Sequence, residues 1–477
     1  MSFETVIGLE VHLQLSTKTK IFCGCAVRFG EAVNSQTCPV CLGLPGVLPV
    51  LNRETLNSGV KVALSLNCKV RETLKFDRKN YFYPDLPKNF QISQYDMPLG
   101  FNGQLEVFPP KDESFTVRIL RVHMEEDAGK LIHQQGGKVG LVDYNRTGVP
   151  LLEIVSEPDM RSPEQAYQYL QTLKQTLKYL GVSTCDMEKG SLRCDANISL
   201  RKTGAKELGV KAEVKNLNSF KAVRAALAFE VDRQGQLLSE GKKITQETLL
   251  WDDAKQKTQS MRSKEFAHDY RYFPEPDLMV FSVSKETVSE VQGALPELPR
   301  ARSLRLVKEY QLSDYDARGM CAERETADFF EAGVKAGGVP KLVANWIQGD
   351  LAALANERHV GIYELGLTSV HLASLTQLLE KKTINSKMAK ELLPKILETK
   401  KDPSELIKEL GLEQVSDQSA LKAVAQKVIE ANPKAVEDYR KGKVQSIKFM
   451  VGQMMRETKG QAAPDVAAKA LEEVLNS

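Results

Sequence analysis

The sequence lacks three features, and each absence excludes a class of protein. Neither sign of charge is in excess, because 65 Lys and Arg residues oppose 62 Asp and Glu residues. A protein that coats polyanions generally would be strongly basic, so only a local basic surface for RNA remains possible. No stretch approaches the run of about 18 apolar residues that crosses a membrane. No apolar signal or Arg-rich transit pattern precedes the first expected strand, so we expect a cytoplasmic protein.

The common nucleotide-binding motifs are also missing. The chain contains no G-x-x-x-x-G-K-[ST] loop, no G-x-G-x-x-G turn and no protein-kinase signature. Their absence excludes a P-loop site and a Rossmann site. The length of 477 residues predicts about three domains. Eight cysteines in a cytosolic chain of this size indicate metal ligands or buried thiols rather than disulfides.

The first regular stretch, residues 6–15, alternates apolar and polar side chains, which predicts a strand with two different faces. The apolar face comprises Ile7, Leu9, Val11, Leu13 and Leu15, and the polar face comprises Gly8, Glu10, His12 and Gln14. A carboxylate and an imidazole two residues apart on a strand point the same way. Glu10 and His12 can therefore share a divalent cation. The alternative is an ordinary strand whose polar side faces water.

Two close cysteine pairs follow the first strand. Cys23 and Cys25 are separated by twelve residues from Cys38 and Cys41. This spacing fits four thiolates around one tetrahedral zinc, with no position left open for water, so the site would be structural. Four unrelated thiols are the alternative. We expect the scattered cysteines, Cys68, Cys185, Cys194 and Cys321, to be buried.

A polar and aromatic stretch spans residues 76–88, with the sequence FDRKNYFYPDLPK. Two prolines exclude a regular helix. Positive charges that suit phosphate stand beside rings that suit a base or an aminoacyl group. The alternative is a loop that packs on a sheet. A second stretch of this kind, residues 269–277 (DYRYFPEPD), is expected to close the first domain.

Further strands extend the two-faced pattern. Residues 116–127 place Arg121, His123 and Glu125 on one face, and residues 191–200 and 210–215 alternate in the same way. Glu153 interrupts an apolar run, where a charge is costly unless it is paired or binds metal. We therefore expect an antiparallel sheet with one face covered by helices and a polar trough on the other.

A helix is predicted over residues 52–66, after the cysteine loop. Helices that cover the sheet are predicted from the N-cap Ser162 to Gly181 and from about Ser219. Carboxylates, a histidine, Lys and Arg in one trough suit a magnesium-bound nucleotide.

The residue pattern changes after a Pro-containing linker at residues 295–299. Helical stripes replace strands, and the last 75 residues contain lysine-bearing segments at 441–448 and 459–461. These segments suit a phosphate backbone, and the alternative is a solvated helical face.

Long motifs along the chain resemble one family. They are VIGLEVH (6–12), KFDRKNYFYPD (75–85), QISQ (91–94), HMEEDAGK (123–130), EIVSEPD (153–159), GSLRCDANIS (190–199), DYRYFPEPD (269–277) and KGQAAP (459–464). They resemble the B subunits of tRNA-dependent amidotransferases over essentially the full length. The resemblance implies an α+β fold with three parts. A glutamine-synthetase-like antiparallel-sheet cradle (1–292) precedes an all-α helical domain (293–402) and a small helical tail that binds tRNA (403–477).

The resemblance also implies an activity and partners. The chain would act in a heterotrimer with an amidase A subunit and a small C subunit. It would use ATP and Mg²⁺ to phosphorylate the side-chain carboxylate of Glu-tRNA(Gln), Asp-tRNA(Asn) or both. Ammonia from the A subunit would then displace phosphate. An acyl phosphate provides the leaving group that a carboxylate lacks, and a closed trough protects it from hydrolysis.

Two alternatives to this activity remain. One is a tRNA-docking surface without chemistry, although such a face should not concentrate carboxylates. The other is a free-standing ligase that makes its own ammonia. It would need a glutaminase nucleophile, for which the zinc-type cysteines are poor candidates.

Residue roles follow from the matched motifs. Glu10, His12 and Glu125, with Glu153 next, would be magnesium ligands. Lys79 and Arg193 would contact phosphate, and Tyr81, Tyr83 and Asp85 would shape the aminoacyl pocket. Some family members lack the four cysteines, so zinc at Cys23, Cys25, Cys38 and Cys41 is predicted from their spacing in this chain.

Overall fold

The computed structural model describes residues 2–475 except 134–139, 264–269, 411–417, 442, 444, 459–461 and 463. Asp269 of the second aromatic stretch and the lysine segment at 459–461 lie outside the described residues. The chain divides into two compact units, Met1–Leu298 and Pro299–Ser477, and each is described by itself.

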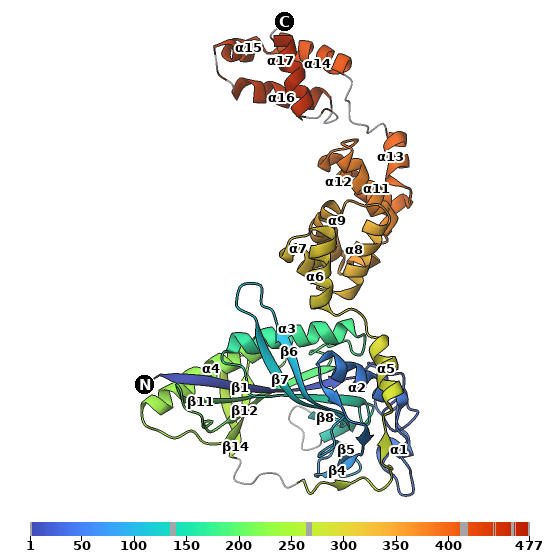
Figure 1. Cartoon of the computed structure of the whole chain (residues 1–477), viewed down its shortest axis with the longest axis vertical. Helices are drawn as coiled ribbons and strands as arrows, with labels where there is room; N and C mark the ends of the chain where they lie inside the picture. Colours follow the sequence, from blue (N-terminus) through green and yellow to red (C-terminus); the bar gives the residue numbers. More distant parts are fainter. Residues whose placement is uncertain are drawn as a thin grey trace. The chain divides into compact units, whose positions relative to one another are not determined.

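A nine-stranded sheet forms the centre of the first unit (Figure 1), in the order β14-β13-β12-β11-β1-β10-β7-β6-β2. Its strands are β1 (Phe3–Gln14), β2 (Lys69–Val70), β6 (Gly100–Val107), β7 (Phe115–Glu126), β10 (Pro150–Ser156), β11 (Leu192–Lys202), β12 (Ala212–Lys215), β13 (Glu247–Asp252) and β14 (Lys257–Ser263). All neighbouring pairs are antiparallel except β12 and β13, which are parallel.

The alternation in the sequence sets the two faces of this sheet. Ile7, Leu9, Val11 and Leu13 of β1 are fully buried in the main apolar core, whereas Glu10 and His12 keep partial exposure. A register slip of one residue would exchange the two faces, so burial of one face fixes the pairing.

Three long helices pack on the apolar face: α2 (Arg53–Ser65), α3 (Pro163–Tyr179) and α4 (Phe220–Ser239). Figure 1 shows α3 and α4 running along the same side of the sheet. The Ser162 hydroxyl accepts a hydrogen bond from Gln165 N–H at the start of α3, and Ser219 caps α4 through Ala222 N–H. These hydroxyls satisfy amide groups that a helix start leaves unpaired.

Short elements complete the first unit. A three-stranded sheet runs in the order β15-β4-β5 and lies beside β7. Two further sheets have two strands each, β16-β3 and β8-β9. Their bounds are β3 (Thr73–Leu74), β4 (Asp77–Asn80), β5 (Phe90–Ser93), β8 (Lys130–His133), β9 (Gly140–Asp143), β15 (Phe273–Pro274) and β16 (Phe281–Ser282). The remaining helices are α1 (Pro39–Leu42) and α5 (Lys285–Gly293).

The second unit is helical throughout its described residues. It contains α6 (Pro299–Tyr310), α7 (Asp314–Met320), α8 (Arg324–Lys335), α9 (Pro340–Trp346), α10 (Ala352–Arg358), α11 (Ser369–Glu380), α12 (Ser386–Thr399), α13 (Pro403–Leu410), α14 (Gln418–Ala431), α15 (Pro433–Arg440), α16 (Gln445–Glu457) and α17 (Pro464–Leu475). A π-helical turn at Ile347–Leu351 joins α9 to α10, and a 3₁₀ turn covers Ile362–Glu364. Side chains of α6–α13 share one apolar core, and those of α14–α17 share another.

The structure confirms a mixed α and β fold, with a large sheet followed by helices. Two details differ from the expectation. The sheet is not purely antiparallel, because β13 joins β12 in parallel. The strand expected over residues 210–215 begins at Ala212, and Val210 is exposed. No helix in the described part of the chain is long and apolar enough to cross a membrane.

Candidate functional site

A row of four polar residues crosses the polar face of the large sheet. The register pairs Arg193 of β11 with His12 of β1, His12 with Glu153 of β10, and Glu153 with His123 of β7. Directly paired residues on neighbouring strands have adjacent side chains. The sheet therefore brings together groups that lie far apart in the sequence.

The centre of this row is a group of potential metal ligands. The side chains of His12, Glu125 and Glu153 offer donor atoms that all lie within 4.8 Å of one another. His12 Nε2 is 3.6 Å from Glu125 Oε1 and 3.6 Å from Glu153 Oε2. Two carboxylates and one imidazole suit a divalent cation such as Mg²⁺ or Mn²⁺. The residues present therefore fit a metal site.

His123 closes the group from the β7 side. Its Nε2 lies 3.1 Å from Glu153 Oε2 and 3.8 Å from Glu125 Oε2. Burial lowers the pKa of His123, but Glu153 and Glu125 act more strongly and raise it to about 9. Burial also raises the pKa of Glu125 and Glu153. His123, followed by His12 and Lys79, outweighs that effect, so both pKa values are lowered. The buried carboxyl groups are thus held in the charged form that binds cations.

Glu10 precedes His12 by two residues on β1 and lies outside the group of His12, Glu125 and Glu153. It is paired across the strands with Asp195 of β11, and its Oε1 accepts a hydrogen bond of 2.9 Å from Asn197 Nδ2. Asp195 in turn accepts a 2.8 Å bond from Lys215 Nζ. The sequence places Glu10 and His12 on one face, as observed, but Glu10 is not among the three grouped ligands.

Lys79 of β4 is a cation without an anionic partner. No carboxylate among the described residues lies within ion-pair distance of its ammonium group, which faces the rings of Tyr270 at 5.0 Å and Tyr81 at 5.8 Å. Burial lowers the pKa of Lys79, while Glu125 and more distant charges raise it, with a net upward shift. A charged, partly dehydrated lysine in this position is ready to bind an anion.

Arg193 is already paired. Its guanidinium donates a 3.0 Å hydrogen bond to Asp127 Oδ1, and Asp127 also accepts a 2.6 Å bond from Gln14. Burial lowers the pKa of Arg193, but Asp127 more than restores it. The buried Nε of Arg193 has no partner within the described residues. The Arg193 side chain keeps 36% exposure, so part of it remains accessible to another acceptor.

The three residues expected to shape an aminoacyl pocket lie in different surroundings. The Tyr81 hydroxyl donates to Gln91 Oε1 at 3.4 Å, and burial raises the pKa of Tyr81. Tyr83 is exposed. Asp85 is partly buried, and its backbone carbonyl accepts a bond from Gly129 N–H. Tyr81 is thus beside Lys79, whereas Tyr83 lies in the exposed part of the loop.

Several residues of the site were not selected as candidates from the sequence. His123 is on the polar face predicted for residues 116–127, and its alternation with Arg121 and Glu125 was the available signal. Asp127 was marked only by its place at the end of the stretch 116–127, and Tyr272 only by its place in the second aromatic stretch. Tyr272 stacks on Tyr95 with ring centroids 4.2 Å apart, and it raises the pKa of Lys79.

The four cysteines near the start of the chain form one cluster. The sulfur atoms of Cys23, Cys25, Cys38 and Cys41 all lie within 4.8 Å of one another. Ligands at about 2.3 Å from a tetrahedral zinc are about 3.8 Å apart, so this cluster fits zinc. A hydrogen bond from Cys23 is the main cause of the lowered pKa of Cys41, and the same contact raises the pKa of Cys23. The four remaining cysteines are buried, as predicted.

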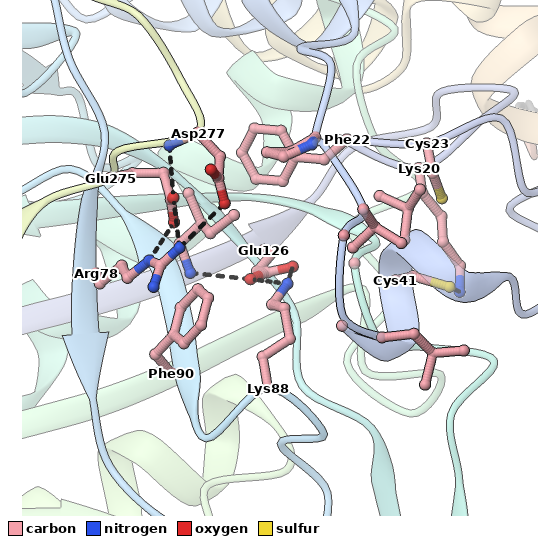
Figure 2. Close-up of a pocket in the computed structure, with 18 residues that line it drawn as sticks. Lys20, Phe22, Cys23, Cys41, Arg78, Lys88, Phe90, Glu126, Glu275 and Asp277 are labelled. Atoms are coloured by element: carbon pink, nitrogen blue, oxygen red, sulfur yellow. Dashed lines mark hydrogen bonds and ion pairs between the residues drawn. The ribbon is translucent and has the colours of Figure 1, made fainter.

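A cavity of about 180 Å³ separates the cysteine cluster from a group of ion pairs (Figure 2). Lys88 Nζ lies 2.5 Å from a carboxylate oxygen of Glu126. Arg78 donates two hydrogen bonds to Glu275, at 2.8 and 2.9 Å. Each charge that these pairs contribute to the cavity wall is already matched by an opposite one.

Comparisons with known proteins agree over the whole chain. A family model described as the GatB/GatE catalytic domain matches residues 5–289, and one described as the GatB domain matches residues 328–475. Relatives named as the B subunit of aspartyl/glutamyl-tRNA(Asn/Gln) amidotransferase are similar along their full length. The relative from Carboxydothermus hydrogenoformans is 52% identical over 476 residues, which cover 99% of both chains. The relative from Thermodesulfovibrio yellowstonii is 50% identical over 475 residues, which cover 100% of both chains.

Proposed function

The chain belongs to the GatB family, and from this premise we propose that it is the B subunit of an aspartyl/glutamyl-tRNA(Asn/Gln) amidotransferase. In this role it phosphorylates the side-chain carboxylate of a misacylated tRNA with ATP. The resulting acyl phosphate reacts with ammonia, the C–O bond to phosphate breaks, and the amide and inorganic phosphate are released. The substrate is Glu-tRNA(Gln), Asp-tRNA(Asn) or both.

One observation carries this proposal: two charged, buried carboxylates converge with a histidine and act electrostatically on Lys79, a lysine that has no ion-pair partner among the described residues. His12, Glu125 and Glu153 would hold Mg²⁺, with Glu10 close by. A magnesium ion bound there would supply positive charge to the phosphate oxygens. Lys79 would bind the transferring phosphoryl group or the substrate carboxylate from the other side. A surface for docking tRNA without chemistry has no use for buried carboxylates, because they repel phosphates.

Other residues orient the reactants. Arg193, fixed by Asp127, would contact phosphate through the exposed part of its side chain. Tyr81 would border the aminoacyl group, and Tyr83 and Asp85 would line the entrance to this pocket. Glu125 and Glu153 are themselves buried, and a closed site around them would protect an acyl phosphate from hydrolysis.

The remaining parts of the chain have supporting roles in this proposal. The first unit is a cradle of the glutamine synthetase type. The helices that follow form a helical domain and then a tail that contacts tRNA, through lysines that include Lys441, Lys443 and Lys448. The four cysteines hold a structural zinc. An amidase A subunit supplies ammonia, and a small C subunit completes the heterotrimer.

Nucleotide binding to the purified heterotrimer tests the proposal. We expect ATP to bind by calorimetry in the presence of Mg²⁺, and Mn²⁺ to bind with an electron paramagnetic resonance signal that ATP changes. Glu153→Gln should abolish this coupling, whereas Glu106→Gln on the exposed side of β6 should keep it. ATP binding that is independent of Mg²⁺ and of Glu153 would contradict the assignment.

A further inference from the structure

Lys20 is the one lysine in the described residues with no solvent exposure. It follows β1 and precedes the first cysteine pair. Its ammonium group lies 3.6 Å from Cys41 Sγ and 3.4 Å from the backbone carbonyl oxygen of Tyr144. No carboxylate in the described part of the chain lies within ion-pair distance of it. Figure 2 shows the Lys20 side chain ending beside the Cys41 sulfur, on the side of the cavity away from Arg78.

A buried ammonium group is unfavourable unless an anion lies beside it. The nearby carboxylate, Glu126, is already paired with Lys88 at 2.5 Å. The carbonyl oxygen of Tyr144 is a neutral acceptor. The negative charge that Lys20 requires must therefore come from the cysteine cluster.

The cluster supplies this charge only when its thiols are deprotonated. Four thiolates around one Zn²⁺ carry a net charge of −2, whereas four thiols carry none. Cys41 is the buried cysteine of the four, and its sulfur also accepts a 3.2 Å hydrogen bond from Cys38 N–H. Two donors thus point at the same sulfur.

We propose that Lys20 is the counter-cation of the four-cysteine zinc site. It reduces the charge of the zinc and its thiolates from −2 to −1 and fixes the Cys41 sulfur through a charge-assisted hydrogen bond. Outer groups of this kind commonly orient metal ligands and strengthen metal binding. Lys20 is a positioning residue and has no part in the phosphoryl chemistry. This inference rests on the proposed zinc binding.

The second partner of Lys20 connects this site to the loop expected at the aminoacyl group. The Tyr144 hydroxyl donates a 2.9 Å hydrogen bond to the Pro84 carbonyl oxygen, and Tyr144 N–H donates a 2.7 Å bond to Asn34 Oδ1. Asn34 lies between the two cysteine pairs. Lys20 and Tyr144 therefore join the cysteine loop to residues 81–88.

The test is the rate at which zinc leaves the full-length protein in its heterotrimer. Zinc content is measured by elemental analysis, and release to a coloured chelator is followed for wild type, Lys20→Met, Lys20→Arg and Lys18→Met. Lys18 is exposed two residues away and serves as the matched control. Loss of an outer-shell partner typically weakens metal binding about 10- to 100-fold. We expect release from Lys20→Met to accelerate by such a factor. Lys20→Arg should recover much of the loss, because the cavity beside Lys20 leaves space for a guanidinium.

Cobalt substitution provides a readout that does not depend on activity. The sulfur-to-cobalt charge-transfer band should shift in Lys20→Met and stay in place in Lys18→Met, and the presence of the band shows that the site is folded. Wild-type protein without zinc would overturn the zinc proposal itself. Zinc-loaded wild type with equal release rates and bands in Lys20→Met would overturn only the role of Lys20.

Discussion

His12 and Glu153 face each other on neighbouring strands, with 3.6 Å between the imidazole Nε2 and a carboxylate oxygen. They lie far apart in the sequence, and the antiparallel pairing of β1 with β10 brings them together. Glu125 joins them from β7, which pairs with β10 on the side away from β1. Because regular strands hold all three, the group is preorganised, which favours a metal site over a flexible surface cluster.

Replacements of Glu153 and Glu10 should differ in their effect on activity. Glu153→Gln removes a grouped carboxylate, and we expect ATP-dependent phosphate release to fall at least about 100-fold, equivalent to some 3 kcal/mol. Glu10→Gln should weaken phosphorylation less, because Glu10 lies outside the three-residue group, and tRNA binding should stay near normal in both variants. Steady-state phosphate release and filter binding measure these effects. Equal loss of activity and tRNA binding would indicate misfolding and remove the metal assignment.

Replacement of Lys79 should lower activity without lowering the stability of the protein. Lys79 is a partly buried cation without a carboxylate partner, so Lys79→Met removes a desolvated charge without breaking an ion pair. We expect the melting temperature to stay the same or rise and amide formation to fall at least about 100-fold. Lys69→Met, on the exposed part of β2, is the control for both measurements. A large drop in melting temperature with retained activity would contradict the role given to Lys79.

Of the eight cysteines, only the four clustered ones should be needed to bind zinc. Elemental analysis should find about one zinc per chain. Cys38→Ser should lose the metal and lower the melting temperature, because metal binding stabilises the folded loop. Cys321→Ser removes a buried cysteine from the helical unit and should keep the full zinc content. A folded, metal-free wild type would exclude the zinc site.

The N-cap of α3 should contribute to the stability of the first unit. Ser162→Ala leaves the Gln165 N–H without its acceptor, and N-cap replacements of this kind cost about 1 kcal/mol. Urea unfolding is followed by Trp251 fluorescence in a Trp346→Phe background. Trp251 lies in the core of the first unit and Trp346, the other tryptophan, in that of the second, so the signal then reports on the first unit. Ser289→Ala, on the exposed side of α5, should change the midpoint little. Identical midpoints for the two variants would show that the cap is dispensable.

Local patterns in the sequence predicted much of this fold. Alternation identified the buried and polar faces of β1, β7 and β11, and serines marked the starts of α3 and α4. These signals are local because a side chain's face or a helix cap depends on a few neighbouring residues. The paired cysteine spacing likewise anticipated the cluster of Cys23, Cys25, Cys38 and Cys41.

Relationships between distant strands could not be predicted in the same way. The parallel pairing of β12 with β13 depends on the connection through α4. The separation of Glu10 from the His12 group depends on strand order, because Asp195 and Asn197 of β11 lie beside Glu10. The pairing of Arg193 with Asp127 and the contact of Lys20 with Cys41 also depend on tertiary packing. Such contacts carry no signal in a single sequence.

Amide formation by the purified heterotrimer tests the central claim most directly. The assay supplies ATP, Mg²⁺ and ammonium chloride, with Glu-tRNA(Gln) and Asp-tRNA(Asn) in separate reactions, to wild type, Glu125→Gln and Glu106→Gln. Ammonium chloride replaces the ammonia that the A subunit would provide, so the reaction reports on this chain. We predict that wild type and Glu106→Gln cleave ATP and form Gln-tRNA or Asn-tRNA, and that Glu125→Gln does neither. ATP left intact by wild type with both tRNAs, or full activity in Glu125→Gln, would contradict the assignment of the polar sheet face as the phosphorylation site.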